Sequence, residues 1–278
     1  MTHLTDPDGR QARDLPFHAI VAFIVITFAI TWGIAFTYIF LPDWAVATFG
    51  DIRGGHPLYF VATWGPAIAG ISLVLYHSGL TGLRAFLSRL FQWRGAPGWW
   101  LLILFGFPLV FMAGSLIKGG PLLTPTPEEG FGMLVVLAII MLLLGPIEEF
   151  GWRGVAQPLL QRRVAPFWAG AIIGAVWGVW HLPAFYLSGV VFAEWDFLPF
   201  FIGNITLAIL VTPIFNATRG GLLLPMVFHW QLILPFWPDA QPWDAWLFVA
   251  LTAAVVWVRR KEMFSRSGAV TQVVPEAA

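Results

Sequence analysis

Residues 131–153 read FGMLVVLAIIMLLLGPIEEFGWR. The stretch opens with a long apolar run, and two adjacent carboxylates, Glu148 and Glu149, lie near its end. A bilayer core of about 30 Å is crossed by roughly 20 helical residues, so a helix of this length can span a membrane. A charged side chain at the bilayer centre costs about 2.5–3.5 kcal/mol on insertion scales. The stretch therefore predicts a membrane span in which two carboxylates need a specific reason to be present.

The composition of the whole chain agrees with a membrane protein. Of its 278 residues, 58% are hydrophobic and 11% charged, and the mean hydropathy is +0.77. Soluble domains carry roughly a quarter charged residues, whereas lipid accepts apolar side chains without penalty. We therefore predict an integral, multi-pass protein in contact with membrane lipids. Its short, loop-poor build is typical of a prokaryotic plasma-membrane protein.

Several classes of function are disfavoured by what the chain lacks. The formal net charge is zero, so no bulk electrostatic argument points to a nucleic-acid partner. The chain has no Cys, which excludes disulfides, cysteine catalysis and thiolate metal sites. A serine nucleophile is also disfavoured, because no Gly-x-Ser-x-Gly motif occurs.

Hydrophobicity predicts an all-α fold, a polytopic transmembrane helix bundle of about eight spans. A single bundle domain is expected at residues 15–260, between a mobile polar N-terminal tail at 1–14 and a mobile C-terminal tail at 261–278. The expected spans lie at residues 18–41, 57–76, 98–117, 131–151, 166–187, 197–217, 221–236 and 242–258.

The distribution of basic residues predicts the orientation of this bundle in the membrane. If the N-terminus is cytoplasmic, the outer loops hold only Arg53 and Lys118 of the 15 Lys and Arg residues. The inner segments then hold Arg10, Arg13, Arg84, Arg89, Arg94, Arg153, Arg162, Arg163, Arg219, Arg259, Arg260, Lys261 and Arg266. The positive-inside rule therefore predicts an even number of spans with both termini cytoplasmic.

The segment from Leu80 to Arg94 has its own pattern. Apolar residues recur at helical spacing, with Arg84, Ser88 and Gln92 among them. This pattern is typical of a helix that lies flat on the cytoplasmic leaflet. A helix packed on the bundle fits it equally well.

The polar residues within the spans are the candidate functional residues. Arg153 follows Glu149 by four residues, so it shares a helical face with that carboxylate and can hold it ionised. Glu148 has no cation in helical register and diverges from Glu149 by about 100 degrees, which favours a separate role. Adjacent carboxylates also resist ionising together, which suits one of them to acid–base work.

Two histidines extend this set. His181 lies in the fifth span and His229 in the seventh. A lone intramembrane His is more often a packing residue, but two of them with a Glu pair from separate spans indicate a site. A carboxylate and an imidazole can together deprotonate a water molecule, while a second imidazole donates to an oxyanion. The same Glu148, His181 and His229 could instead bind Zn²⁺; no HExxH motif is present, and the sequence does not choose between these mechanisms.

These motifs resemble those of the CPBP (Abi) intramembrane protease family, which includes the type II CAAX prenyl endopeptidases. The resemblance rests on Glu148-Glu149-x-x-x-Arg153, on an aromatic residue four positions before His181, and on His229, and it covers about residues 80–235. It implies an intramembrane endopeptidase that hydrolyses a peptide bond of a membrane-associated protein or peptide, lipidated substrates included. Cleavage is expected close to the cytoplasmic side.

The resemblance also implies a role for each matching residue. Glu148 and His181 would activate the water, whereas Glu149 and Arg153 would orient and stabilise the site. His229 would help to form the oxyanion hole. Family mechanisms include both a metal centre and a metal-free glutamate, and we expect the metal-free chemistry here.

Two positions depart from the family pattern. Trp177 stands where Phe is usual, and Ile233 stands where the third motif has Asn. Ile cannot donate to an oxyanion, and the loss of one such donor costs about 10²–10³ in rate. We expect Asn204 to substitute for the missing donor.

Two other functions stay open from the sequence. A non-catalytic membrane immunity or scaffold protein of the same family is favoured by Ile233. A proton-coupled transporter is also compatible, because intramembrane Glu and His residues form proton relays. Transporters often contain inverted repeats, and the sequence has no clear repeat.

Overall fold

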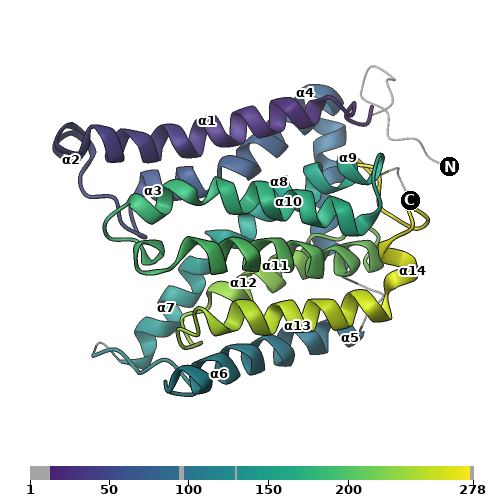
Figure 1. Cartoon of the computed structure of the whole chain (residues 1–278). Helices are drawn as coiled ribbons and strands as arrows, with labels where there is room; N and C mark the ends of the chain where they lie inside the picture. Colours follow the sequence, from purple (N-terminus) through teal and green to yellow (C-terminus); the bar gives the residue numbers. More distant parts are fainter. Residues whose placement is uncertain (1–12, 94–96, 129, 276–278) are drawn as a thin grey trace.

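The computed structural model describes residues 13–93, 97–128 and 130–275 and contains no strand in these ranges. Six of its helical segments are long and apolar enough to cross a membrane, and two further apolar helices are shorter. These segments lie side by side as a bundle (Figure 1). The predicted all-α polytopic fold is therefore confirmed, and the two shorter helices correspond to the two shortest expected spans, 221–236 and 242–258.

The helices alternate in direction along the bundle, as Figure 1 shows. Short 3₁₀ and π turns interrupt or extend several of them. The α-helices are α1 (Ala19–Phe40), α2 (Pro42–Phe49), α3 (Pro57–Thr63), α4 (Gly65–Leu87), α5 (Pro97–Leu101), α6 (Phe107–Lys118), α7 (Phe131–Leu142), α8 (Glu149–Gly151), α9 (Gln157–Gln161), α10 (Pro166–Trp180), α11 (Phe197–Ala217), α12 (Leu223–Ile233), α13 (Trp243–Val258) and α14 (Arg260–Met263).

The fourth span is broken where the two carboxylates lie. After α7, Leu144 leaves the helical conformation with φ −94° and ψ −99°. A 3₁₀ turn at Gly145–Glu148 then leads into α8, and a π turn at Trp152–Ala156 separates α8 from α9. Local π turns within helices often accompany functional sites. The break allows Glu148 and Glu149 to point into the bundle from one irregular segment.

Small residues bring the helices around this break into close contact. A Cβ atom on Gly151 of α8 would lie 2.3 Å from the carbonyl oxygen of Pro66 in α4. A Cβ atom on Gly174 of α10 would lie 2.4 Å from the Cα atom of Ile205 in α11. Glycine is the residue that permits such backbone approach between membrane helices. These contacts hold α4, α8, α10 and α11 at the positions on which the site depends.

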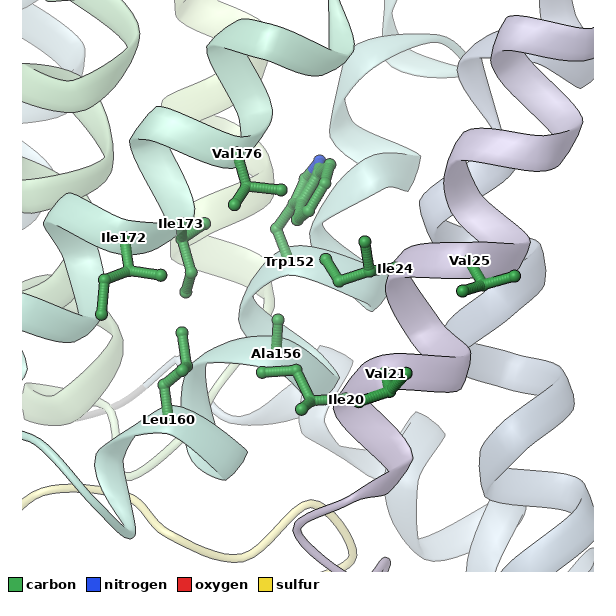
Figure 2. Close-up of a pocket in the computed structure, with 10 residues that line it drawn as sticks. All are labelled: Ile20, Val21, Ile24, Val25, Trp152, Ala156, Leu160, Ile172, Ile173 and Val176. Atoms are coloured by element: carbon green, nitrogen blue, oxygen red, sulfur yellow. The ribbon is translucent and has the colours of Figure 1, made fainter.

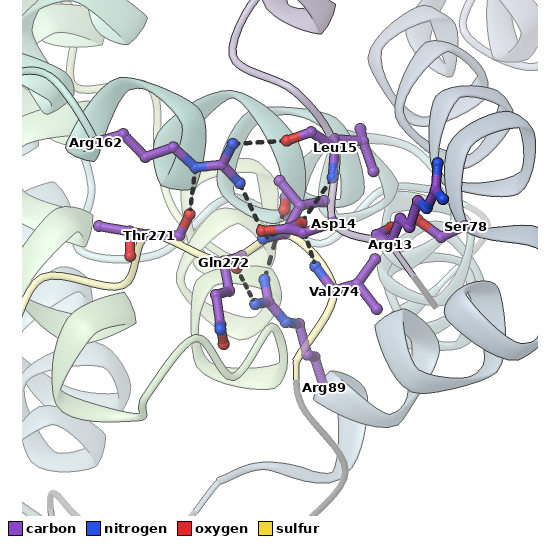
Figure 3. A network of polar contacts seen from close by, with 11 residues as sticks. Arg13, Asp14, Leu15, Ser78, Arg89, Arg162, Thr271, Gln272 and Val274 are labelled. Carbon is purple, nitrogen blue, oxygen red and sulfur yellow. Dashed lines mark hydrogen bonds and ion pairs between the residues drawn. The ribbon is translucent and has the colours of Figure 1, made fainter. Parts of the chain in front are cut away.

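The C-terminal segment packs against the bundle as far as Pro275, which corrects the expectation of a mobile tail from residue 261 onward; residues 276–278 lie outside the described residues. Val273 is fully buried, and its backbone N–H donates to Asp14 Oδ1 at 3.1 Å. Arg162 donates to Asp14 Oδ2 at 2.6 Å and to the carbonyl oxygens of Leu15 and Thr271 (Figure 3). The two ends of the described chain thus meet at one end of the bundle. Of the predicted N-terminal tail, residues 1–12 lie outside the described residues.

The segment from Leu80 onward packs on the bundle. Gly79 adopts φ 63° and bends α4, which then continues to Leu87 and a 3₁₀ turn. Phe86 and Arg89 are buried, whereas Leu80 and Phe91 are exposed. Of the two expected arrangements, the structure favours the packed helix over one that lies free on the leaflet. Arg94 lies outside the described residues.

The contact between Gly151 and Pro66 makes a stability prediction. Gly151→Ala should lower the stability of the detergent-solubilised protein, because the new methyl group meets a backbone oxygen that cannot yield, at a cost of about 1–3 kcal/mol. Gly33→Ala in α1 is the matched control, since a Cβ atom there has no neighbour within 4 Å. A thermal unfolding midpoint for Gly151→Ala equal to that of Gly33→Ala would contradict the packing described here.

Candidate active site

Three of the predicted site residues line one cavity of about 550 Å³ within the bundle. Glu148 reaches it from the break after α7, His181 from the end of α10, and His229 from α12. Asn204 and Ile233 line the same cavity. Glu149 and Arg153 are buried behind this wall.

Glu149, Arg153 and His229 form one ionic group. Glu149 Oε1 lies 2.8 Å from His229 Nδ1, and Glu149 Oε2 lies 3.3 Å from Arg153 Nε. All three side chains are at least 95% buried. A buried charge needs partners of this kind, because removing one of them leaves an uncompensated charge. The expected pairing of Glu149 with Arg153 is present, and it also orients the His229 ring.

Glu148 is held in a different way. Its Oε2 atom accepts hydrogen bonds from Trp177 Nε1 at 2.9 Å and from Trp152 Nε1 at 3.2 Å. No protein donor among the described residues bonds to its other carboxylate oxygen. Glu148 is 3% exposed and lines the cavity. One oxygen is thus fixed by two neutral donors, and the carboxylate has the other available for a water molecule.

His181 is oriented by the same tryptophan residue. Its Nδ1 atom lies 2.8 Å from the backbone carbonyl oxygen of Trp177, which requires hydrogen on Nδ1. In the neutral ring, Nε2 is then the proton acceptor. Trp177 therefore contacts Glu148 through its indole and His181 through its carbonyl, and its ring centroid lies 5.2 Å from that of His229.

The backbone at Gly145 makes room for the His229 ring. A Cβ atom on Gly145 would lie 2.5 Å from His229 Nε2 and 2.9 Å from Ile233 Cδ1. Because Nδ1 of His229 faces Glu149, Nε2 is the ring nitrogen beside the broken span. Any larger residue at 145 would displace the imidazole.

The two departures from the family pattern have different consequences. Trp177 supplies an indole N–H to Glu148, which Phe lacks. Ile233 places an apolar side chain in the cavity wall. Asn204 donates through Nδ2 to the carbonyl oxygen of Phe200 at 2.9 Å, and one amide hydrogen remains after that bond. It is therefore chemically able to donate into the cavity.

Sequence reasoning missed Trp152 and Trp177 as partners of Glu148. Trp152 follows Glu148 by four residues, and Trp177 precedes His181 by four. Helical spacing from Glu148 would have found Trp152, whereas the bond from Trp177 to Glu148 joins two separate spans and has no signal in the spacing. A role for either Trp in the site was not expected, because Trp in membrane proteins usually lies at the membrane–water interface.

The residues do not fit the metal site that the sequence left open. In the described part of the chain, no group of three or more His, Asp or Glu side chains is placed to hold a metal ion. We derive no step through Zn²⁺.

A second hollow is unrelated to this chemistry. It lies between α1 and the helices α9 and α10, and Figure 2 shows that apolar side chains line it. Trp152 is part of its wall, with Ile24 and Val176 on either side. The hollow contains none of the five predicted residues and suits contact with lipid chains.

The cavity lies toward the end of the bundle opposite the termini. Its outer lining comes from the loops after α2, before α11 and before α13, and includes Gly54, Val190 and Trp237. None of its lining residues comes from the end at which Asp14 and Val273 meet. Cytoplasmic termini and cleavage close to the cytoplasmic side were both expected from the sequence. The position of the cavity makes these two expectations incompatible.

The fold and the buried groups together define a class: a polytopic membrane protein with a carboxylate–imidazole centre inside its helix bundle. Comparison with known proteins agrees. Residues 130–232 match the family described as type II CAAX prenyl endopeptidase Rce1-like. The chain is also 26% identical over 202 residues to CAAX prenyl protease 2 of Methanococcus maripaludis, a match that covers 66% of this chain and 73% of the relative. The predicted resemblance to the CPBP family is confirmed, and the family match supports a peptidase.

The bond from Trp177 to Glu148 makes a prediction about peptide cleavage. Trp177→Phe should lower kcat by roughly 10- to 100-fold, because a hydrogen bond to a charged group is worth about 1.5–3 kcal/mol. Trp180→Phe is the matched control, since Trp180 is 3% exposed and its indole nitrogen has no hydrogen-bond partner among the described residues. Equal kcat values for the two variants would show that the indole N–H of Trp177 does not support the carboxylate.

Proposed function

We propose that the chain is an intramembrane endopeptidase that hydrolyses a peptide bond of a membrane-associated protein or peptide. The observation that carries this proposal is the Glu148 carboxylate. Two indole N–H groups hold one of its oxygens, and it shares a cavity with His181 and His229. A carboxylate placed in this way, beside an imidazole with a free acceptor nitrogen, suits general-base activation of water.

The proposed reaction needs no covalent intermediate. Glu148 and His181 Nε2 together act as the base that takes one proton from the water molecule. The water oxygen at the same time attacks the scissile carbonyl carbon. The C–N bond then breaks, and the same groups return the proton to the leaving amine. His181 keeps its orientation through the Trp177 carbonyl oxygen, 2.8 Å from Nδ1. Atoms and protons balance with water as the only co-substrate.

His229 is the proposed donor to the developing oxyanion. Its Nδ1 atom lies 2.8 Å from the Glu149 carboxylate, and its Nε2 atom donates when both ring nitrogens carry hydrogen. Arg153 Nε lies 3.3 Å from the other Glu149 oxygen and places a positive charge beside that carboxylate. Asn204 is the proposed second donor in place of the Asn that Ile233 replaces. Preorganised donors of this kind are often the largest catalytic contribution.

A metal-free reaction makes a separate prediction. Cleavage by the purified protein should keep its rate after dialysis against EDTA and after addition of 1,10-phenanthroline, because every proposed step uses groups of the chain. The measurement is the initial rate before and after treatment, followed by addition of Zn²⁺. A loss of activity that Zn²⁺ restores would replace this mechanism by a metal-assisted one.

The substrate is proposed to be membrane-associated. The relative from Methanococcus maripaludis is named as a CAAX prenyl protease, and lipidated substrates are accordingly included for this chain. The cavity begins inside the bundle. A substrate segment must therefore enter between helices or through the cavity mouth, which is the end surrounded by the loops after α2, before α11 and before α13. The cell membrane of a prokaryote is the proposed location.

Proteolysis is tested by comparing peptide termini in host membranes. The host expresses the wild type, Glu148→Ala or Glu262→Ala at matched levels. Glu262 is the control carboxylate, because it is exposed and pairs with Arg259 far from the cavity. New termini should appear with the wild type and with Glu262→Ala but not with Glu148→Ala. Identical termini in all three membranes, with every variant folded, would favour the immunity or scaffold function, with Ile233 as its cause.

A further inference from the structure

The cavity reaches the loops at one end of the bundle. Its deep wall contains Glu148 and His229, and its outer wall is formed by loop residues such as Gly54, Gly189 and Gln241. These loops connect helices at the end of the bundle opposite the termini, at the left in Figure 1. A substrate that approaches through the cavity mouth must therefore come from that side of the membrane.

The two ends of the bundle carry opposite charge. Among the described residues, the end with the termini has two carboxylates, Asp14 and Glu262, and many basic residues. These are Arg13, Arg84, Arg89, Arg162, Arg163, Arg219, Arg259, Arg260, Lys261 and Arg266. Cytoplasmic segments carry the excess of Lys and Arg in membrane proteins. The basic end is therefore cytoplasmic, and the mouth faces the outer side.

The mouth end is acidic. In the described chain its carboxylates are Asp43, Asp51, Glu128, Glu194, Asp196, Asp239 and Asp244, against Arg53 and Lys118. Both cations are already paired: Arg53 Nη2 lies 3.6 Å from Asp51 Oδ2, and Lys118 pairs with Asp239. Negative charge at the mouth of a low-dielectric cavity attracts cationic ligands.

Asp244 is an acidic residue in the wall of the cavity itself. It is 8% exposed, lines the cavity, and accepts a hydrogen bond from the Ala245 backbone N–H at 2.8 Å through Oδ1. Within the described residues, no Lys, Arg or His side chain forms an ion pair with it. A carboxylate buried this deeply normally has a cationic partner. A positive group of the substrate can provide that partner.

We propose that the catalytic cavity opens to the outer side of the membrane and takes a cationic peptide segment, with a Lys or Arg of the substrate beside Asp244. The proposal rests on the proposed function, since it concerns the substrate of the same site. It departs from the expectation of cleavage close to the cytoplasmic side. The substrate class is a membrane-associated peptide with basic residues next to the cleaved bond on its outer side.

The orientation is tested first, and the chain suits cysteine labelling because it contains no native Cys. Ser188→Cys places an exposed thiol at the mouth end, and Ser267→Cys places one at the end with the termini. A membrane-impermeant maleimide should label Ser188→Cys in intact cells and Ser267→Cys only after the cells are permeabilised. The reverse labelling pattern would overturn the outward-facing mouth, whether or not the protein is a protease.

The substrate class is tested with purified protein in liposomes. The probes are three membrane-anchored peptides that differ only in a dipeptide beside the anchor: Lys-Lys, Gln-Gln or Glu-Glu. The wild type should cleave the Lys-Lys peptide faster than the Glu-Glu peptide by roughly tenfold, a difference that falls as salt is added. Asp244→Asn should reduce this ratio several-fold. Asp43→Asn should leave the ratio unchanged, because Asp43 does not line the cavity.

The outcomes separate the two proposals. Equal cleavage of all three peptides by the wild type would overturn the cationic substrate and leave proteolysis standing. A ratio that is the same in Asp244→Asn and wild type would remove Asp244 from the proposal. If the wild type cleaves none of the peptides and yields no new termini in host membranes, the proposed function itself fails.

Discussion

The site depends on the two hydrogen bonds that hold Glu148 inside the bundle. A carboxylate inside a helix bundle is costly to bury unless it accepts hydrogen bonds, and this one accepts them from the indole N–H groups of Trp152 and Trp177. Trp152 is on the same broken span, and Trp177 is on α10, so the two bonds also fix α10 against the break. The carboxylate keeps its position without the neutralising partner that Glu149 has in Arg153.

This arrangement gives the adjacent carboxylates different environments. Glu149 lies among charged partners and acts on His229, whereas Glu148 lies among neutral donors and faces the cavity. The break in the span makes this division possible, because Gly145 leaves room for the His229 ring and Gly151 permits contact with α4. The backbone irregularity and the close helix packing therefore both serve the position of the two carboxylates on which the proposed acid–base chemistry depends.

Much of this organisation could be predicted from the sequence, because polar residues in apolar spans have few explanations. Glu148, Glu149, Arg153, His181 and His229 were predicted in this way, and the spacing of Glu149 and Arg153 predicted the ion pair that the structure contains. The roles of Trp152 and Trp177 were missed, since 16 Trp residues offer no contrast by composition. The docking of Val273 against the N-terminal segment and the side on which the cavity opens depend on contacts between distant residues, which spacing does not encode.

Glu148 is proposed to activate the water that cleaves the peptide bond. Single-turnover cleavage by purified protein in H₂¹⁸O tests this role, with the wild type and Glu148→Gln compared on the same substrate. The wild type should place one ¹⁸O atom in the new carboxylate. Glu148→Gln keeps the shape of the side chain but cannot accept the proton, so it should form no product in that time. Cleavage by Glu148→Gln at the wild-type rate would show that another group activates the water.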